Sequence, residues 1–519
     1  MQKKTKKILA VIITALLLLQ ISGIVSAVDD QSAEPYAPPN TKGELSAEEL
    51  ATAVLSAADV PELLELSELD EKNHVKRLYE QEDNLDTVIF QNRDGTKSMY
   101  VFSEPVKYID QDGRVKDKKT SISESRLKDG SAKFSVIDND VKLYFPDSLA
   151  ADDSVILRKN DYTISLKPKP PESNLLKINE AIPASKTSYA DSISRKETEA
   201  IVYSSVFGED TSVRYTPHLN GYKEEIILQK NIGLYEFDFI LSVGELEAVC
   251  TDGIIHVYDP LTGNAVVKLD KIFVYDSYTE ANELNGHATY NNEMTIKEID
   301  KNGNYLVKIS VDKDFLNSMN TIYPVYIDPS VYTISHFSTI QDATIFKNDP
   351  TRLGAGAMTK SYVGNYTRKY GLTSDGKNLG IARYLFRFPA LWNSYEIRSL
   401  ESEDMLECNI NLYSCCNDDD YICVFFSYDP WTESTVKGST IPWYDFIGYI
   451  VREFVDSYGW YEFDITYAAG RWCDGAYGGY YNYGVVFYSF YENNPCHTFH
   501  AKESAFTSYR PYVYVRYRK

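Results

Sequence analysis

Residues 510–517, RPYVYVRY, alternate between two kinds of side chain. Val513, Val515 and Tyr517 fall on one face of an extended chain, and Tyr512 and Tyr514 fall on the other. This period of two predicts a strand with one apolar face. Similar runs precede it at ARYLFRF (382–388), LECNINLY (406–413), ICVFFSY (422–428), WYEFDI (460–465) and YGVVFYS (483–489). Regularly spaced antiparallel strands of this kind predict a β-sandwich of the jelly-roll type over residues 336–519.

Residues 86–335 predict a second, mostly antiparallel β region. Its strand-like runs are separated by NRDGT (92–96), DQDGR (110–114), DPLTGN (259–264) and DKNGN (300–304). Each contains a glycine that supplies the positive φ of a tight hairpin turn. The preceding residues, 46–85, predict a helical segment, because Ser46 and Glu49 fit a capping box and apolar residues follow at helical spacing. We therefore expect a mainly β protein with a short helical lead-in.

The first 27 residues have the form of a secretory signal peptide: four lysines, an apolar run and the small-residue site Val25-Ser26-Ala27. Residues 28–45 are rich in proline and polar residues and predict a flexible leader. No apolar run is long enough to favour membrane insertion. We expect a secreted, extracellular protein whose association with the cell wall, if any, is noncovalent.

The net charge of −22, which becomes −26 without the lysines of the signal peptide, argues against nucleic acid as a partner. The apolar content of 43% is that of a folded chain. Six of the seven cysteines follow residue 335, at 408, 415, 416, 423, 473 and 496, so outside the cell they allow 15 disulfide pairings. Cys415 and Cys423 would come close if the chain makes a hairpin near Asp418.

The order of motifs after residue 336 resembles the DNRLRE-type domain of secreted bacterial proteins. The residues that carry the resemblance are DATIF (342–346), ARYLFRFPAL (382–391), CNINLY (408–413), PWTEST (430–435), FDIT (463–466) and the final RPYVYVRY. The resemblance implies a jelly-roll related in architecture to carbohydrate-binding modules. The loop VKGSTIPWYD (436–445) departs from the family pattern.

The region before the module resembles the N-terminal part of wall-associated RHS/YD-repeat proteins. VKYIDQDGRV (106–115), VRYTPHLNGYKEEIIL (213–228), VYDPLTGNAVVKL (257–269) and YPVYIDPS (323–330) carry this resemblance. It implies an RHS-associated β region joined to a binding module. A fold alone does not define a ligand, so the function must be argued from a site.

The candidate carbohydrate site is the glycine- and tyrosine-rich run GAYGGYYNYG (475–484) together with WYD (443–445). Rigid aromatic faces on loops suit the weakly apolar C–H face of a sugar ring. The sequence thus predicts glycan contacts from Trp443, Tyr444, Tyr477, Tyr480 and Tyr481. The other reading is that these aromatic residues pack in the sandwich.

Asn417, Asp418 and Asp420 supply hard oxygen ligands near a turn. A structural calcium ion is therefore one interpretation of this segment, and it is the only cofactor that the sequence suggests. A plain acidic turn is the alternative.

The sequence contains no nucleophile elbow, zinc-protease helix or phosphate loop, and the tetrapeptide Ser125–Lys128 lacks the companion motifs of its enzyme class. Glu462 and Asp464 share a strand face about 7 Å apart and read as solvated acids rather than a glycosidase pair. His497 and His500 read as a surface pair without metal.

We therefore expect a non-catalytic surface protein that binds cell-wall or environmental polysaccharide. The alternatives are a protein-interaction scaffold of an RHS-type system and a polysaccharide-degrading enzyme.

Overall fold

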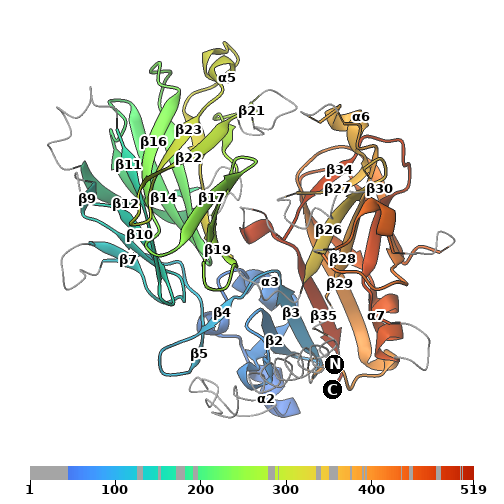
Figure 1. Ribbon diagram of the computed structural model, residues 1–519. Helices are drawn as coiled ribbons and strands as arrows, with labels where there is room; N and C mark the ends of the chain where they lie inside the picture. Colours follow the sequence, from blue (N-terminus) through green and yellow to red (C-terminus); the bar gives the residue numbers. More distant parts are fainter. Residues whose placement is uncertain are drawn as a thin grey trace, which may run out of the picture.

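The computed structural model describes residues 45–124, 132–149, 153–170, 182–190, 197–278, 287–289, 291–334, 340–349, 360–373, 377–388, 391, 394, 396–433, 435–442, 448–474, 481–502, 504 and 507–519. These residues form two β-sandwiches and a short helical lead-in that lies below and between them (Figure 1). The predicted mainly β fold with a C-terminal sandwich is confirmed. No helix within these ranges is long and apolar enough to cross a membrane.

The middle sandwich packs two sheets around one core that runs from Ile122 to Val331. The first sheet has the order β22-β23-β16-β11-β10-β8-β7-β6 and the second has the path β17-β18-β19-β25-β15-β14-β13-β12-β9, with β20, β21 and β24 off the path. The strands of the first sheet are β22 (Glu293–Asp300), β23 (Asn304–Ser310), β16 (Glu236–Ser242), β11 (Tyr162–Lys169), β10 (Val155–Lys159), β8 (Lys142–Phe145), β7 (Phe134–Val136) and β6 (Ser123–Glu124). Those of the second are β17 (Glu247–Thr251), β18 (Ile254–Tyr258), β19 (Ala265–Leu269), β25 (Val331–Thr333), β15 (Gly221–Leu228), β14 (Thr211–His218), β13 (Glu197–Ser204), β12 (Ile182–Ala190), β9 (Ser148–Leu149), β20 (Phe273–Tyr275), β21 (Ala288–Thr289) and β24 (Val325–Asp328).

The C-terminal sandwich is one hydrogen-bonded path that curls into two facing sheets, because β27 pairs with β34 on one side and with β28 on the other. We call its two layers the β35 sheet and the β30 sheet. The β35 sheet holds β1 (His74–Arg77), β2 (Thr87–Asn92), β3 (Lys97–Phe102), β35 (Tyr512–Tyr517), β29 (Met405–Ser414), β32 (Gly459–Asp464) and β34 (His497–His500). The β30 sheet holds β26 (Gln341–Phe346), β28 (Ile381–Arg387), β33 (Val485–Ser489), β30 (Asp420–Phe426) and β31 (Val451–Val455), and β27 (Lys360–Asn365) joins the two.

The alternation that predicted β35 is confirmed residue by residue. Val513, Val515 and Tyr517 are fully buried in the core between the two sheets. Tyr514 instead joins a separate cluster on the outer face, where the helical lead-in packs. The strand therefore has two covered faces, one toward the sandwich and one toward the lead-in.

The sequence placed residues 86–102 with the middle region, and the strand pairing corrects this boundary. β3 pairs with β35 in the register Lys97↔Tyr517 to Phe102↔Tyr512. Figure 1 shows the blue strands β2 and β3 beside the red β35. The middle sandwich is thus an insertion between the third and the later strands of the C-terminal sandwich.

The helical lead-in is shorter than predicted. α2 (Ala47–Thr52) begins with the expected capping box of Ser46 and Glu49, and α3 (Leu66–Glu71) follows. The chain then enters β1 at His74, so the expected helix to residue 85 is wrong beyond Glu71. The lead-in continues as the two-stranded β4 (Lys107–Ile109) and β5 (Val115–Asp117), while α5 (Lys313–Asn317), α6 (Tyr366–Tyr370) and α7 (Thr466–Cys473) lie elsewhere in the fold.

The four predicted hairpin turns are all present. They connect β2 to β3, β4 to β5, β18 to β19 and β22 to β23. The glycine in each has positive φ, between 70° and 83° for Gly95, Gly113, Gly263 and Gly303. At Gly303 a side chain would also collide with the backbone oxygen of Gly244, so this glycine is required by both conformation and space.

Candidate functional site

An exposed cluster of aromatic rings surrounds one arginine on the outer face of the β30 sheet. It consists of Tyr421 on β30, Arg452 and Phe454 on β31, Tyr449 just before β31 and Phe490 just after β33. We call these five residues the Arg452 platform. They were not among the residues singled out from the sequence.

The strand register explains why these side chains meet. Tyr421 lies opposite Phe454, and Cys423 lies opposite Arg452, in the antiparallel β30–β31 pair. The intervening Ile422 and Val424 point into the sandwich core, so Tyr421, Arg452 and Phe454 point away from it. The N–H of Phe490 donates to the carbonyl of Tyr421 over 2.8 Å, which brings the chain after β33 to the same edge.

Arg452 is held among rings rather than by a carboxylate. Its guanidinium carbon lies 5.0 Å from the ring centroid of Tyr421, 5.2 Å from that of Phe490 and 5.7 Å from that of Tyr449. Among the residues that the structure describes, Arg452 has no ion-pair partner, although the chain carries 75 acidic residues. Cation–π contacts of this kind contribute about 0.5–1 kcal/mol each at exposed sites and leave the N–H donors available.

The rings of the platform remain accessible. The exposed fractions are 37% for Tyr421, 43% for Phe454, 47% for Tyr449 and 45% for Phe490. Tyr421 and Phe454 contact each other with centroids 4.9 Å apart. Contiguous exposed aromatic rings are uncommon on a soluble surface and mark a binding surface more often than scattered ones do.

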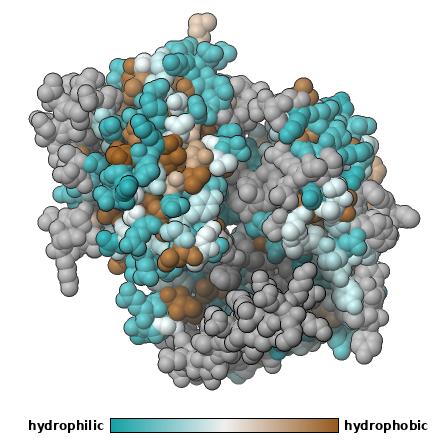
Figure 2. Space-filling model, in the orientation of Figure 1, coloured by the Kyte–Doolittle hydropathy of each residue, from teal (hydrophilic) through white to brown (hydrophobic). Residues whose placement is uncertain are grey.

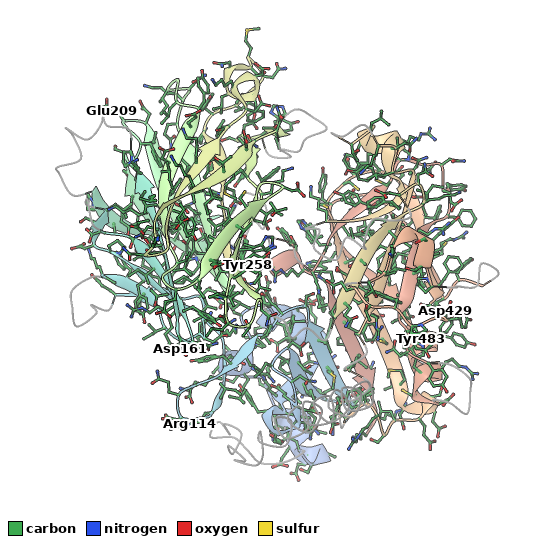
Figure 3. The ribbon with its side chains drawn as sticks, in the orientation of Figure 1. Arg114, Asp161, Glu209, Tyr258, Asp429 and Tyr483 are labelled. Carbon is green, nitrogen blue, oxygen red and sulfur yellow. The ribbon has the colours of Figure 1, made fainter. Side chains whose placement is uncertain are left out.

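The rest of this outer face is covered. The loop 427–442 packs Trp431, Val436 and Ile441 over Phe425 and its neighbours on the β30 sheet. The Trp431 indole N–H donates to the carbonyl of Tyr483 over 2.8 Å, which joins this loop to the one before β33. Figure 3 shows the labelled Asp429 and Tyr483 close together on this side of the sandwich. The Arg452 platform is thus the solvent-exposed end of this face, and the loop that carries Trp431 covers the other end.

Only part of the predicted glycan loop falls within the described residues. Trp443, Tyr444, Tyr477 and Tyr480 lie outside them. Tyr481 is 58% exposed and its ring lies 5.8 Å from that of the half-buried Tyr483. Tyr481 and the Arg452 platform lie toward opposite ends of β30, which at about 3.3 Å per residue spans roughly 20 Å.

The three predicted calcium ligands lie in different environments. Asn417 is exposed, and Asp418 forms an ion pair with Lys369, which already supplies a cation to this carboxylate. Asp420 is buried at the start of β30, and burial raises its pKa to about 6. No group of three or more metal-binding His, Cys, Asp or Glu residues occurs in the described part of the chain.

The expected hairpin between Cys415 and Cys423 is wrong. β29, which ends at Ser414, belongs to the β35 sheet, and β30 belongs to the opposite sheet. Residues 415–419 therefore form a crossover between layers. Cys423 lies on the outer face beneath the loop that carries Trp431, away from Cys415.

His497 and His500 are core residues rather than the expected surface pair. Both lie in β34 and are buried, at 0% and 4% exposure. His497 Nε2 lies 2.8 Å from the hydroxyl of Ser414, and His500 Nδ1 lies 2.7 Å from that of Ser504. Burial lowers the pKa of His497 to about 4 and that of His500 to about 3.

Glu462 and Asp464 are exposed on β32, as predicted for solvated acids. Glu462 lies 3.7 Å from Lys72, and the Asp464 carboxylate accepts the N–H of Thr466 at the start of α7 over 2.8 Å. The Ser125–Lys128 tetrapeptide lies outside the described residues.

Comparison with known proteins gives distant relatives only. No family model matches the chain. The chain is 23% identical over 269 residues to the tRNA(Glu)-specific nuclease WapA of Bacillus subtilis subsp. natto, and 24% identical over 266 residues to the tRNA nuclease WapA of Bacillus subtilis. Each match covers 51% of this chain and 11% of the relative. The tRNA3(Ser)-specific nuclease WapA of Bacillus spizizenii is 27% identical over 35% of this chain and 8% of its own length.

A Paenibacillus xanthan lyase structure aligns with a TM-score of 0.11 and 9% identity over 88% of this chain and 40% of its own, which is too low to compare folds. For the WapA relatives, the match spans only about a tenth of their length.

Proposed function

We propose that this protein is exported and binds polysaccharide through the outer face of the β30 sheet, with the Arg452 platform as the contact surface. The observation that supports the proposal most directly is a set of four part-exposed rings, three of them around an arginine that has no carboxylate partner among the described residues. A sugar ring has a weakly apolar C–H face that stacks on aromatic rings, and hydroxyl groups that accept hydrogen bonds from a guanidinium.

Polar groups on the same outer face agree with this role. Tyr488 lies opposite Cys423 on the neighbouring strand β33. Arg383, on β28, lies over the ring of Tyr488 and pairs with Glu492, 2.8 Å away. In Figure 2 the coloured residues on the visible face of the C-terminal sandwich are mostly hydrophilic. A small apolar contact area within a hydrophilic surface suits a ligand that is itself mostly hydroxylated.

The test is retention of the full-length protein by a panel of insoluble cell walls and soluble polysaccharides in affinity electrophoresis. We expect the double variant Tyr421→Ala/Phe454→Ala to weaken retention at least tenfold. Both rings are part-exposed, so the fold should be preserved, which circular dichroism checks. Trp460→Ala is the matched control, because Trp460 is 41% exposed but lies on the β35 sheet.

Tyr481→Ala separates the platform from the loop predicted from sequence. A loss in this variant alone would move the site to the loop. A folded wild-type protein that no polysaccharide retains would refute glycan binding and favour a protein-interaction scaffold.

A nuclease function is the second candidate, because the three relatives are named tRNA nucleases. We expect no cleavage by this chain, since its match covers about a tenth of those proteins and its net charge of −22 disfavours contact with a polyanion. Incubation with total tRNA followed by a denaturing gel is decisive. Discrete cleavage products that depend on the protein would replace the binding function with an enzymatic one.

A further inference from the structure

Two buried cysteines lie near each other where the crossover from the β35 sheet passes the start of β34. Cys416 lies in the crossover and is 4% exposed, and Cys496 immediately precedes β34 and is fully buried. All seven cysteines of the chain are thiols in this structure. Neither Cys416 nor Cys496 takes part in the proposed glycan site.

Backbone contacts hold the crossover that carries Cys416 against the β34 segment that follows Cys496. The N–H of Thr498 donates to Cys416 Sγ over 3.2 Å, and the N–H of Cys415 donates to the carbonyl of Thr498 over 2.9 Å. Cys496 is two residues before Thr498, so its Cα lies about 5 Å from that same N–H in an extended chain. The Cys416 sulfur is therefore within reach of the Cys496 side chain.

A shared neighbour supports this placement. The side chain of Lys369, on α6, is buried and pairs with Asp418, and its ammonium group interacts electrostatically with both Cys416 and Cys496. Burial raises the pKa of Cys496 to about 12, so the reduced side chain is a neutral thiol at physiological pH. A disulfide is uncharged, so a bridge between two buried sulfurs near this lysine leaves no charge on sulfur in the core.

We propose that Cys416 and Cys496 form a disulfide that fastens the crossover to β34 when the protein reaches an oxidising environment. The reaction is thiol–disulfide exchange with a disulfide oxidant. The two cysteine S–H bonds are lost, one Sγ–Sγ bond forms, and the oxidant accepts two electrons and two protons as it becomes two thiols.

The other cysteines are placed less well for this partner. Cys415 lies beside the same strand, where its Sγ donates to the carbonyl of Thr498 over 3.3 Å, and it is the main competitor of Cys416 for Cys496. Cys423 lies on the outer face beneath Trp431, and Cys408 lies inside the sandwich core. The contacts of Cys416 with β34 favour Cys416–Cys496 among the possible bridges.

The bridge would act on the glycan surface, a consequence that rests on the proposed function. The crossover leads directly into Asp420 and Tyr421, the first residues of β30. Closing a loop of about 80 residues restricts the unfolded chain and fixes the end of the strand that carries the platform.

The experiment oxidises the full-length protein in a glutathione redox buffer, traps remaining thiols by alkylation and maps peptides without reduction. We expect a cross-linked peptide pair that contains Cys416 and Cys496, and a fall in melting temperature of roughly 5–15 °C on reduction. The double variant Cys416→Ser/Cys496→Ser should lack this fall on reduction, apart from any part that a bridge between other cysteines contributes. Cys423→Ser is the control and should keep the bridge.

Recovery of both Cys416 and Cys496 as alkylated thiols after oxidation would overturn the proposal, and so would a bridge from Cys415 to Cys496. The mapping uses the wild-type protein, so it does not depend on whether a variant folds. Glycan retention that is unchanged on reduction, in a protein whose bridge has been mapped, would leave the disulfide established and remove its link to the platform.

Discussion

Glu224 makes the stability of the middle sandwich depend on pH. It lies on β15 between Tyr222 and Ile226 of the core-facing set, and it is fully buried. One carboxyl oxygen accepts the hydroxyl of Tyr215 over 2.9 Å, and the other has no hydrogen-bond partner among the described residues. Burial raises the pKa of Glu224 to about 8 from the ordinary value of 4.5. The folded protein therefore keeps this acid protonated at neutral pH.

The sign and size of the effect follow from this difference. The unfolded chain releases the proton above pH 4.5, and the folded chain does so only near pH 8. The contribution of Glu224 to stability is therefore complete below pH 4.5 and is lost as the pH rises toward 8. At about 1.4 kcal/mol per pH unit, the loss has an upper limit of about 5 kcal/mol.

The perturbation is Glu224→Gln, which keeps the shape and removes the ionisation. We expect the variant to be slightly less stable than wild type at pH 5, because the amide N–H groups need new partners at a cost of about 1–3 kcal/mol. At pH 9 it should be more stable than wild type by a few kcal/mol. Glu236→Gln on β16 is the matched control, since Glu236 is exposed and pairs with Lys308 at the surface.

Urea unfolding at pH 5, 7 and 9 measures the effect. All five tryptophans follow residue 335, so their fluorescence reports the C-terminal sandwich, while far-ultraviolet circular dichroism reports both sandwiches. The pH-dependent transition should appear in circular dichroism. Parallel pH profiles for wild type and Glu224→Gln would refute the argument that this carboxyl is protonated in the folded state.

Two further predictions concern the C-terminal sandwich. The pKa values of His497 and His500 are lowered in the folded protein, so between pH 6.5 and about 4 only the unfolded chain binds these protons. The contribution of the two histidines to stability is therefore complete above pH 6.5 and is lost as the pH falls toward 4. Tryptophan fluorescence should show an acid transition that His497→Gln weakens. A fragment that begins at residue 336 lacks β1–β3 and leaves the edge of β35 unpaired, so we expect it to associate or aggregate in analytical ultracentrifugation, whereas the full chain should sediment as a discrete species.

Features encoded by neighbouring residues could be predicted from the sequence. The turns at Gly95 and Gly303 follow from short motifs, and the capping box at Ser46 uses two residues in one helical turn. The two faces of β35 follow from alternation along six residues. In each case the deciding interactions lie within a few positions of one another.

Features that depend on distant partners could not. The pairing of β3 with β35 joins residues more than 400 positions apart, and neither strand carries a sequence feature that identifies its partner. The crossover at 415–419 was mistaken for a hairpin because alternating strands flank it, although it contains no glycine to form a tight turn.

The Arg452 platform was missed because Glu453 occupies an inward position of β31, where alternation predicts an apolar residue. That position is half-buried at the open edge of the sandwich, which tolerates a charge.

The insertion also orders the events of folding. β1, β2 and β3 precede the middle sandwich along the chain, but the free side of β3 is completed only by β35, which follows it. The middle sandwich has its own core from Ile122 to Val331, and all its partners are available before β35 emerges. Domains with complete sets of contacts fold as units as the chain appears. The middle sandwich should therefore form first and hold its two connections close together, which reduces the loop that β3 must close to meet β35.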